Sequence, residues 1–450
     1  MKFKPKSIGL IRDPMKKIFL LTIIGLTSLF QATKAQNLYF PPLSTTATWD
    51  TISPASLGWC TNEIDALYDY LQQQDTKGFI VLKDGKIVLE KYFGTFTKDS
   101  LWYWASAGKT ITSFLVGKAQ EENYLSITDT SSTYLGKGWT NCTIAQENKI
   151  KIRNQLTMTS GLDDGVPDNH CIIDTCLNYL ADEGTRWAYH NAPYTLLERV
   201  LTTATGTPIN TYTQTELKRK TGMTGAWAYV DYDNVFFSKV RSMARFGLLI
   251  QNNCIWNNDT LLYDTSYVQQ MTNTSQSLNL SYGYLWWLNG KSSYMLPTSQ
   301  IVFPGSYAPA APSDMFAGLG KNGQIVSISK RLGLVVVRMG NQATSGEVPT
   351  QLCNTIWEKL NSVMCNLTSI NETLPNTTTV SIFPNPANSE INIVLPSNDN
   401  TQIEITNAMG QLVIKDQNKN KIDISNLKNG LYFISVKHGQ KTYTQKIIKQ

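Results

Sequence analysis

Histidine is scarce in this chain of 450 residues, which contains only His170, His190 and His438. No Cys-x-x-Cys pair is present either. Histidine and cysteine are the usual zinc ligands, so we expect no dedicated zinc site and no cofactor. A metal site formed by Asp and Glu carboxylates is the remaining alternative. The Gly-x-Ser-x-Gly elbow is also missing. A Ser-His-Asp mechanism is therefore not favoured, and we expect His190 to flank a cleft rather than act as a base.

Long apolar runs are missing except at one place. Thirteen mostly apolar residues (18–30) follow Met15-Lys16-Lys17 and precede a stretch of small residues. This arrangement predicts a secretory signal peptide over residues 1–35, cut near Ala35. The run is too short to span a bilayer comfortably, so a membrane anchor is the weaker reading. We expect an exported protein, secreted or at the cell surface, with no transmembrane span in the mature chain.

A basic surface is missing too, despite a net charge of +6. The excess of Lys and Arg lies at the two ends, in residues 1–34 and 401–450, and the remainder of the chain is mildly acidic. Such a distribution does not provide a surface for a phosphate backbone, so we expect no nucleic-acid partner.

Seven cysteines are compatible with an oxidising compartment. Cys171 and Cys176 are close enough in sequence to close a small ring, and Cys353 with Cys365 is the next candidate pair. The other three cysteines cannot be paired from sequence, and an odd number leaves at least one thiol.

The feature that points to chemistry is Ser106-Ala107-Gly108-Lys109, at the start of an apolar helical pattern. Residues three apart share one side of a helix, so the lysine amine can sit against the serine hydroxyl and activate it as a nucleophile. Burial would favour the neutral amine. The same spacing at Ser327–Lys330 falls in a strand-like run and at Ser425–Lys428 in a loop. The alternative is that Ser106 merely caps the helix.

The order of the patterns predicts an α/β fold. An amphipathic helix is expected over 62–74, two strands around Asp84-Gly85, three strands over 314–340 and a helix over 350–364. Residues 104–290 are interpreted as mainly helices and loops. Strands at both ends with helices between predict one antiparallel sheet with flanking helices, a helical lobe beside it, and a cleft at their junction. A polar linker (366–379) and short alternating strands follow, which predict a small β-sandwich over 380–450.

A Ser-Lys pair needs a further group that carries the proton to the leaving group. Tyr189-His190-Asn191 offers a phenol, whose pKa a neighbouring cation can lower, and an amide that can orient a substrate carbonyl. The same Tyr-x-Asn spacing recurs at Tyr232-Asp233-Asn234, so the pattern alone is weak.

Several segments together resemble the serine β-lactamase-like family of class C β-lactamases, D-Ala-D-Ala peptidases and related esterases and amidases. The segments are Ser106–Lys109, Gln155–Leu162, Glu183-Gly184, Tyr189–Asn191, Ser242–Gly247, Gly323–Val326 and Leu334–Val337. The resemblance implies a β-lactamase/transpeptidase-like fold over residues 36–365. It implies Ser106 as the nucleophile, Lys109 as its activating partner, Tyr189 as second base and proton carrier, and Asn191 in substrate placement.

The third motif of that family departs from its pattern. Gly318-Leu319-Gly320 followed by Lys321 stands where Lys-Thr-Gly or His-x-Gly is expected, so the first position carries no cation. The N–H of Ser106 with that of Gly320 or Lys321 can still form an oxyanion hole. The missing cation favours esters or amides without a carboxylate. Trp104, Trp102 and Trp187 could form a wall of an apolar substrate pocket. The alternative is that they belong to the core.

The final 71 residues resemble the C-terminal sorting domains of the type IX secretion system of Bacteroidota. The matching segments are Ile382–Ala387, Asn407–Gly410, Ile424–Leu427, Gly430–Tyr432 and Gln445–Lys449. The resemblance implies the type IX machinery as a partner.

We therefore expect an exported serine hydrolase that cleaves a small-molecule or cell-wall-like ester or amide. The alternatives are a β-lactamase or D,D-peptidase of the same fold, and a non-catalytic surface-binding protein.

Overall fold

The computed structural model describes residues 38–44, 46–342, 346–365, 381–383, 387–394, 401–407, 411–438 and 441–450. The chain divides into two compact units, residues 1–368 and 369–450, called here the body and the tail. The predicted signal peptide (1–35) and linker (366–379) lie outside the described residues and stay predictions.

The body contains the predicted antiparallel sheet. Its order is β2 (Lys86–Tyr92), β1 (Thr76–Lys83), β13 (Leu334–Gly340), β12 (Gln324–Ser329), β11 (Phe316–Gly320) and β8 (Trp287–Leu288). β1 from the start of the body pairs with β13 from its end, with Ile80 opposite Val337. The hairpin at Asp84-Gly85, the strands over 314–340 and the antiparallel sheet are confirmed.

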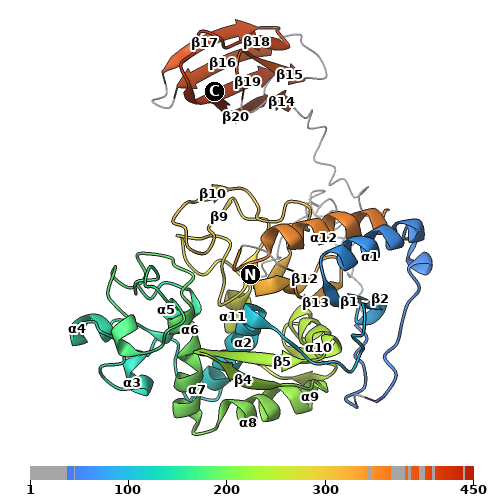
Figure 1. Cartoon of the computed structure of the whole chain (residues 1–450), viewed down its shortest axis with the longest axis vertical. Coiled ribbons are helices and arrows are strands. Elements are labelled where there is room, and N and C mark those ends of the chain that lie inside the picture. The colour runs from blue at the N-terminus through green and yellow to red at the C-terminus, as the bar shows by residue number, and fades with distance from the viewer. Residues whose placement is uncertain are drawn as a thin grey trace, which may run out of the picture. The chain divides into compact units, whose positions relative to one another are not determined.

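Helices cover both faces of this sheet, which explains why β11 to β13 are buried along their whole length. On one face, α12 (Thr350–Val363) packs beside α1 (Ile64–Gln73), and Trp357 of α12 donates a hydrogen bond to Ser327 of β12. On the other face, α10 (Val240–Gln251) places Gly247 against Val326 and Val335. Figure 1 shows these helices on opposite sides of the strands. Both predicted terminal helices are confirmed.

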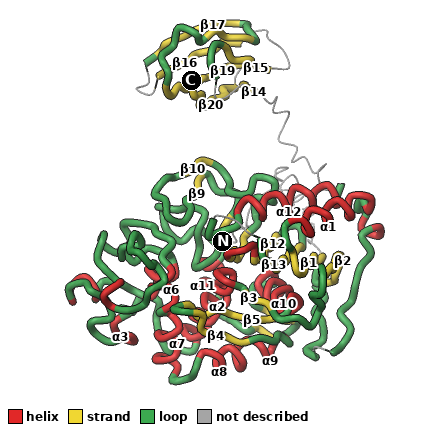
Figure 2. Tube along the Cα trace, viewed as in Figure 1, coloured by secondary structure: helices red, strands yellow, loops and turns green. Residues whose placement is uncertain are grey.

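The middle of the body forms the helical lobe (Figure 1). Its helices are α2 (Lys109–Glu121), α3 (Ser132–Leu135), α4 (Ile144–Glu147), α5 (Ile152–Leu156), α6 (Asn191–Thr195), α7 (Leu197–Thr205), α8 (Ile209–Thr213), α9 (Arg219–Thr221) and α11 (Thr265–Met271). Between α11 and β11 the chain is mostly loop, interrupted by β8 and by the short pair β9 (Ser293–Tyr294) and β10 (Phe303–Pro304), as Figure 2 shows.

The interpretation of residues 104–290 as helices and loops missed a small sheet. β4 (Ala226–Val230) and β5 (Asp233–Ser238) form a hairpin, and β5 also pairs with β3 (Trp102–Tyr103) directly before Ser106. A second short hairpin joins β6 (Ile255–Trp256) to β7 (Asp259–Thr260). β5 alternates between buried and partly buried side chains, but its sequence, Asp-Asn-Val-Phe-Phe-Ser, does not alternate between polar and apolar residues.

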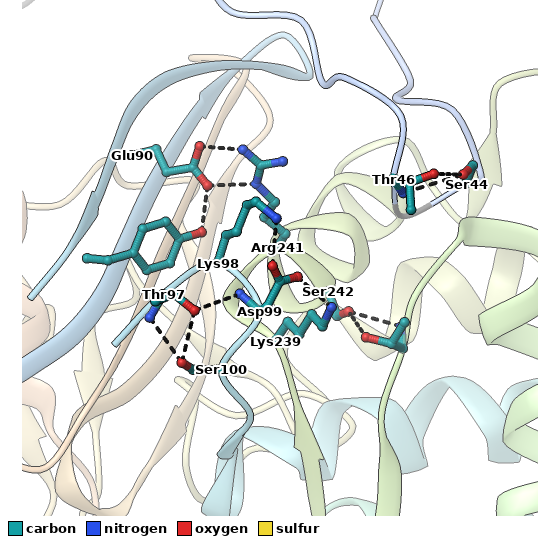
Figure 3. A network of polar contacts seen from close by, with 12 residues as sticks. Ser44, Thr46, Glu90, Thr97, Lys98, Asp99, Ser100, Lys239, Arg241 and Ser242 are labelled. Atoms are coloured by element: carbon teal, nitrogen blue, oxygen red, sulfur yellow. Dashed lines mark hydrogen bonds and ion pairs between the residues drawn. The ribbon is translucent and has the colours of Figure 1, made fainter. Parts of the chain in front are cut away.

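A polar network fastens the edge strand β2 to the start of α10 (Figure 3). Arg241 binds Glu90 through two hydrogen bonds, each 2.7 Å long, and Tyr92 donates a third to the same carboxylate. Nearby, Asp99 pairs with Lys239 at 2.8 Å and with Lys98. The bidentate Arg–carboxylate geometry makes the first pair the stronger connection.

The disulfides correct one prediction. Cys171 pairs with Cys176 as predicted, but Cys365 pairs with Cys60 and not with Cys353. Cys353 lies buried in α12, while Cys365 lies just beyond its end. Twelve residues of helix extend about 18 Å, so these two cysteines cannot meet. Cys142, Cys254 and Cys353 are free thiols.

The tail is the predicted small sandwich. One sheet contains β14 (Ser381–Phe383), β15 (Glu390–Val394) and β18 (Lys421–Asp423). The other contains β17 (Leu412–Gln417), β16 (Thr401–Asn407), β19 (Gly430–His438) and β20 (Lys441–Lys449). Isoleucines from both sheets, such as Ile391 and Ile405, share one core. In the part of the chain that the structure describes, no helix is long and apolar enough to cross a membrane.

Candidate active site

Ser106 lies in the 3₁₀ turn η4 (Ala105–Gly108), which leads directly into α2. The preceding residue, Ala105, has a φ of 45°. This left-handed conformation is rare for a residue with a Cβ, and such strain tends to occur at functional sites. The Ser106 side chain is partly exposed and lines a cavity of about 350 Å³.

Lys109, the first residue of α2, is only 3% exposed. Its Nζ donates a hydrogen bond of 2.9 Å to Oδ1 of Asn191 and lies 3.8 Å from the centre of the Tyr194 ring. Burial lowers the pKa of the lysine to about 8, although the negative charges of Asp233 and Glu347 act in the opposite direction. A substantial fraction of neutral amine is therefore present near pH 8.

Tyr189 also reaches the nucleophile, but with a different pKa from the one expected. Burial raises the pKa of its phenol well above the ordinary value, and the hydrogen bond with Ser106 offsets only part of this effect. The ring is enclosed by the aromatic residues Trp187, Tyr282 and Trp287. The expected lowering is wrong because burial disfavours the phenolate, and the negative charges of Glu347 and Asp233 raise its pKa further. Tyr189 is a neutral hydroxyl at ordinary pH.

Gly318 and Gly320 occupy alternate positions of β11 and so face the same side of the sheet, toward η4. A Cβ on Gly320 would lie 2.4 Å from the carbonyl oxygen of Trp104 and 3.0 Å from the backbone nitrogen of Ser106. A Cβ on Gly318 would lie 2.9 Å from a methyl of Thr110. Only glycine lets the strand approach the nucleophile this closely. Lys321, directly after β11, is exposed and lines the cavity.

Trp104 does not have the predicted place in a substrate pocket. It is fully buried, donates a hydrogen bond of 2.7 Å to Ser238, and does not line the cavity. Side chains alternate along a strand, so its neighbour Tyr103 faces the cavity instead. Trp102 and Trp187 are also absent from the lining, so all three tryptophans belong to the core or its edge.

The cavity also contains residues that were not among the predicted site residues. They are Tyr103, His170, Tyr194, Val230, Asp233, Asn234, Val235, Phe237 and Glu347. Asp233 and Asn234 belong to the second Tyr-x-Asn match, which the structure brings to the same cavity through the β4–β5 hairpin. Nδ1 of His170 lies 2.7 Å from Oδ2 of Asp233, and its Nε2 lies 3.2 Å from Nδ2 of Asn191.

His190, in contrast, is buried away from the cavity lining. Neither ring nitrogen has a hydrogen-bond partner among the described residues, and burial lowers its pKa to about 4. A neutral buried imidazole fits the expectation that it does not serve as the base. Within the described ranges, no cluster of three His, Cys, Asp or Glu side chains could hold a metal ion.

Comparison with known proteins gives matches along most of the chain. The family described as Beta-lactamase matches residues 65–352, and the Secretion system C-terminal sorting domain matches residues 381–450. A 180-residue segment is 24% identical to a Bacillus subtilis protein named penicillin-binding protein PbpX, and covers 37% of this chain. The segment spans 44% of that relative, which is less than half of its length.

Two solved structures share the fold. A Bacillus anthracis protein named as a 6-aminohexanoate-dimer hydrolase has a TM-score of 0.55 and 18% identity over 75% of this chain and 91% of its own. A Bacteroides dorei protein named as a beta-lactamase has a TM-score of 0.54 and 18% identity over 68% of this chain and 99% of its own. At these identities the likeness concerns the fold alone.

Proposed function

The chain belongs to the beta-lactamase family, and from this premise we propose that it is an exported serine hydrolase that forms an acyl-enzyme on Ser106. Its substrate is an ester or amide. The observation that carries the proposal is the buried Lys109, one helical turn from Ser106, with its pKa lowered to about 8. A buried amine of this kind is the base that a weak nucleophile needs.

The tail has its own assignment. Residues 381–450 form a C-terminal sorting domain of the type IX secretion system, as their resemblance to such domains predicts. The protein is therefore secreted or at the cell surface. Residues 36–365 are the proposed hydrolase domain.

In the proposed acylation, Oγ of Ser106 attacks the substrate carbonyl while its proton passes to Nζ of Lys109. Because Nζ already donates to Asn191, the lone pair of the neutral amine can point toward the serine. The N–H groups of Ser106 and of Gly320 or Lys321 would bind the oxyanion that forms. Asn191 would also help to place the substrate carbonyl.

The leaving group then needs a proton. Tyr189 would donate its hydroxyl proton to the departing oxygen or nitrogen and regain one from Lys109. Because its pKa is raised, Tyr189 would pass on a proton without persisting as the phenolate. Water would hydrolyse the acyl-enzyme by the reverse proton route.

The cavity supports an uncharged acyl group. Tyr103, Val235 and Phe237 supply apolar wall, and the first position of the third motif is Gly318 rather than a cation. One observation favours a second candidate, a β-lactamase or D,D-peptidase. Lys321 lines the cavity and could bind a substrate carboxylate.

The first experiment is the intact mass of the full-length mature chain after exposure to a fluorophosphonate, beside its Ser106→Ala variant. We expect one adduct on the wild type and none on the variant. Hydrolysis of a panel of esters, amides and penicillins then separates the two candidate substrates. No adduct on either folded protein would contradict the proposal and favour a non-catalytic binding protein.

A further inference from the structure

A chain of polar contacts leads away from Lys109 into the cavity wall. Nζ of Lys109 donates to Oδ1 of Asn191 at 2.9 Å, Nδ2 of Asn191 lies 3.2 Å from Nε2 of His170, and Nδ1 of His170 lies 2.7 Å from Oδ2 of Asp233. We propose that His170 and Asp233 are positioning residues that fix the Asn191 amide, and through it the amine of Lys109. This inference rests on the function proposed above.

With the Asn191 amide oriented so that its oxygen faces Lys109, hydrogen-bonding capacity selects one tautomer of His170. The amide nitrogen of Asn191 can only donate, so Nε2 of His170 must accept and cannot carry a proton. The other ring nitrogen, Nδ1, then carries the proton, and the Asp233 carboxylate 2.7 Å away stabilises the N–H on that side of the ring. With its nitrogen held by His170, the amide must turn its oxygen toward Lys109.

The loop that carries His170 is built to hold this position. The backbone N–H of His170 donates to the side chain of Asp168 at 2.9 Å, and the N–H of Ala192 donates to the carbonyl of Asn169 at 3.0 Å. The second bond attaches the loop directly to the start of α6, where Asn191 lies. The next residue, Cys171, is tied to Cys176. Hydrogen bonds and a disulfide therefore hold the segment that provides these contacts, although the His170 side chain itself is 40% exposed.

Loss of the arrangement should slow the reaction and leave substrate binding nearly intact. If Nε2 of His170 no longer accepts, the Asn191 amide nitrogen keeps only its longer bond of 3.4 Å to Oδ1 of Asn169, and the amide can turn its NH₂ group toward Lys109 more easily. That group would repel the ammonium form of Lys109 and would donate to the lone pair of the neutral form, so the lone pair would no longer be available to Ser106. A displacement of about 1 Å at a reacting group costs up to about a hundredfold in rate.

Two matched variants test the tautomer argument with p-nitrophenyl butyrate as the probe ester. His170→Gln places an acceptor near the position of Nε2, so we expect kcat/KM within about threefold of the wild type. His170→Asn keeps a group for Asp233 but cannot reach Asn191. For it we expect kcat to fall about ten- to hundredfold, with KM changed less than about twofold. Equal rates for the two variants would overturn the proposal.

Asp233→Asn is a second test that does not depend on the His170 variants folding. Removal of this charge also lowers the pKa of Lys109, so a purely electrostatic role predicts an unchanged or faster rate. The positioning role predicts at least about a tenfold loss of kcat, because the proton is no longer held on Nδ1 of His170. Assays at pH 9 keep the amine mostly neutral in both proteins. An undiminished kcat would overturn the proposal.

Asp163→Asn is the control, since this carboxylate lies in the same loop and its described side-chain bond is to the nearby N–H of Gly165. We expect it to match the wild type. The Ser106→Ala variant distinguishes a failure of the proposed function from a failure of the positioning role of His170 and Asp233. If it hydrolyses the ester as fast as the wild type, the proposed function fails and this inference with it. If it is inactive while all His170 and Asp233 variants match the wild type, only this inference fails.

Discussion

The Lys109 amine is almost fully buried at the wall of the cavity, and two carboxylates limit the cost of its charged form. Burial lowers its pKa to about 8, against the effects of Asp233 and Glu347. If the neutral amine accepts the proton of Ser106, the rate must rise with pH and level off above about 8. This sign follows because protonation removes the base.

The Glu347→Gln variant tests the role of this charge. Without the carboxylate, the ammonium form is less stabilised, so the pKa of Lys109 falls further and the rising limb of the pH–rate profile moves to lower pH. At pH 7 we expect a higher rate, since a larger fraction of the amine is then neutral. Glu358→Gln, an exposed change on α12, should leave the profile in place. A limb that moves to higher pH would contradict the prediction.

Residues adjacent in sequence were the ones that could be predicted. Ser106 and Lys109 are spaced by one helical turn, and Tyr189 and Asn191 stand two apart. Local spacing made both pairs candidates, and the helical context of Ser106 and the family resemblance distinguished them from the other matches. His170, Asp233 and Glu347 reach the cavity only through the folding of separate segments, and no local pattern predicts such a meeting. The fall expected for the pKa of Tyr189 was wrong for a related reason. Its burial depends on Trp187, Tyr282 and Trp287, two of which are distant in sequence.

Among the elements, β11 and η4 determine how closely the sheet approaches the nucleophile. The prediction of strands over 314–340 came from their alternating pattern, which reports burial and not which helix or turn lies opposite. The small sheet of β3, β4 and β5 was missed because its strands are short and interrupted by a hairpin in a mainly helical region. That sheet supplies Asp233 and Asn234 to the cavity.

Gly320→Ala tests the contact between β11 and η4. Gly320 has an ordinary φ of −131°, so the backbone tolerates alanine and the effect comes only from the new Cβ against Trp104 and Ser106. We expect kcat with p-nitrophenyl butyrate to fall about a hundredfold, and the free energy of unfolding to fall by about 1–3 kcal/mol.

Gly318→Ala provides the comparison for this prediction. Its Cβ would meet side chains of Thr110 and Val326, which crowds the same strand without touching the backbone nitrogen of Ser106. We expect a similar loss of stability by chemical denaturation but a smaller loss of kcat. A smaller effect of Gly320→Ala than of Gly318→Ala on kcat would show that the close approach to Ser106 is not what matters.

For the whole body, the Cys60–Cys365 disulfide joins residues 305 positions apart. Sequence could not select this pair, since its partners meet only when both ends of the body reach the same place. In the chain-entropy account, a loop of this length stabilises the fold by up to about 5 kcal/mol, and the five-residue separation of Cys171 and Cys176 by about 2 kcal/mol.

Replacement of both cysteines of each pair by serine measures how much each disulfide stabilises the body. We expect the Cys60→Ser/Cys365→Ser protein to unfold at a lower denaturant concentration than the Cys171→Ser/Cys176→Ser protein, with reductant absent. The second protein should instead lose activity, since Cys171 follows His170. The reverse order of the two denaturation midpoints would contradict this assignment.

The same disulfide makes residues 60 to 365 a closed covalent ring. A protease that cuts one peptide bond inside a ring opens it but releases nothing, so the two pieces stay joined and remain folded against each other. The exposed loop between β9 and β10 could be cleaved once without separating the segment that carries Ser106 from the strand that carries Gly320. For a protein at the cell surface or beyond it, where proteases are met without chaperones, activity would outlast the first cut.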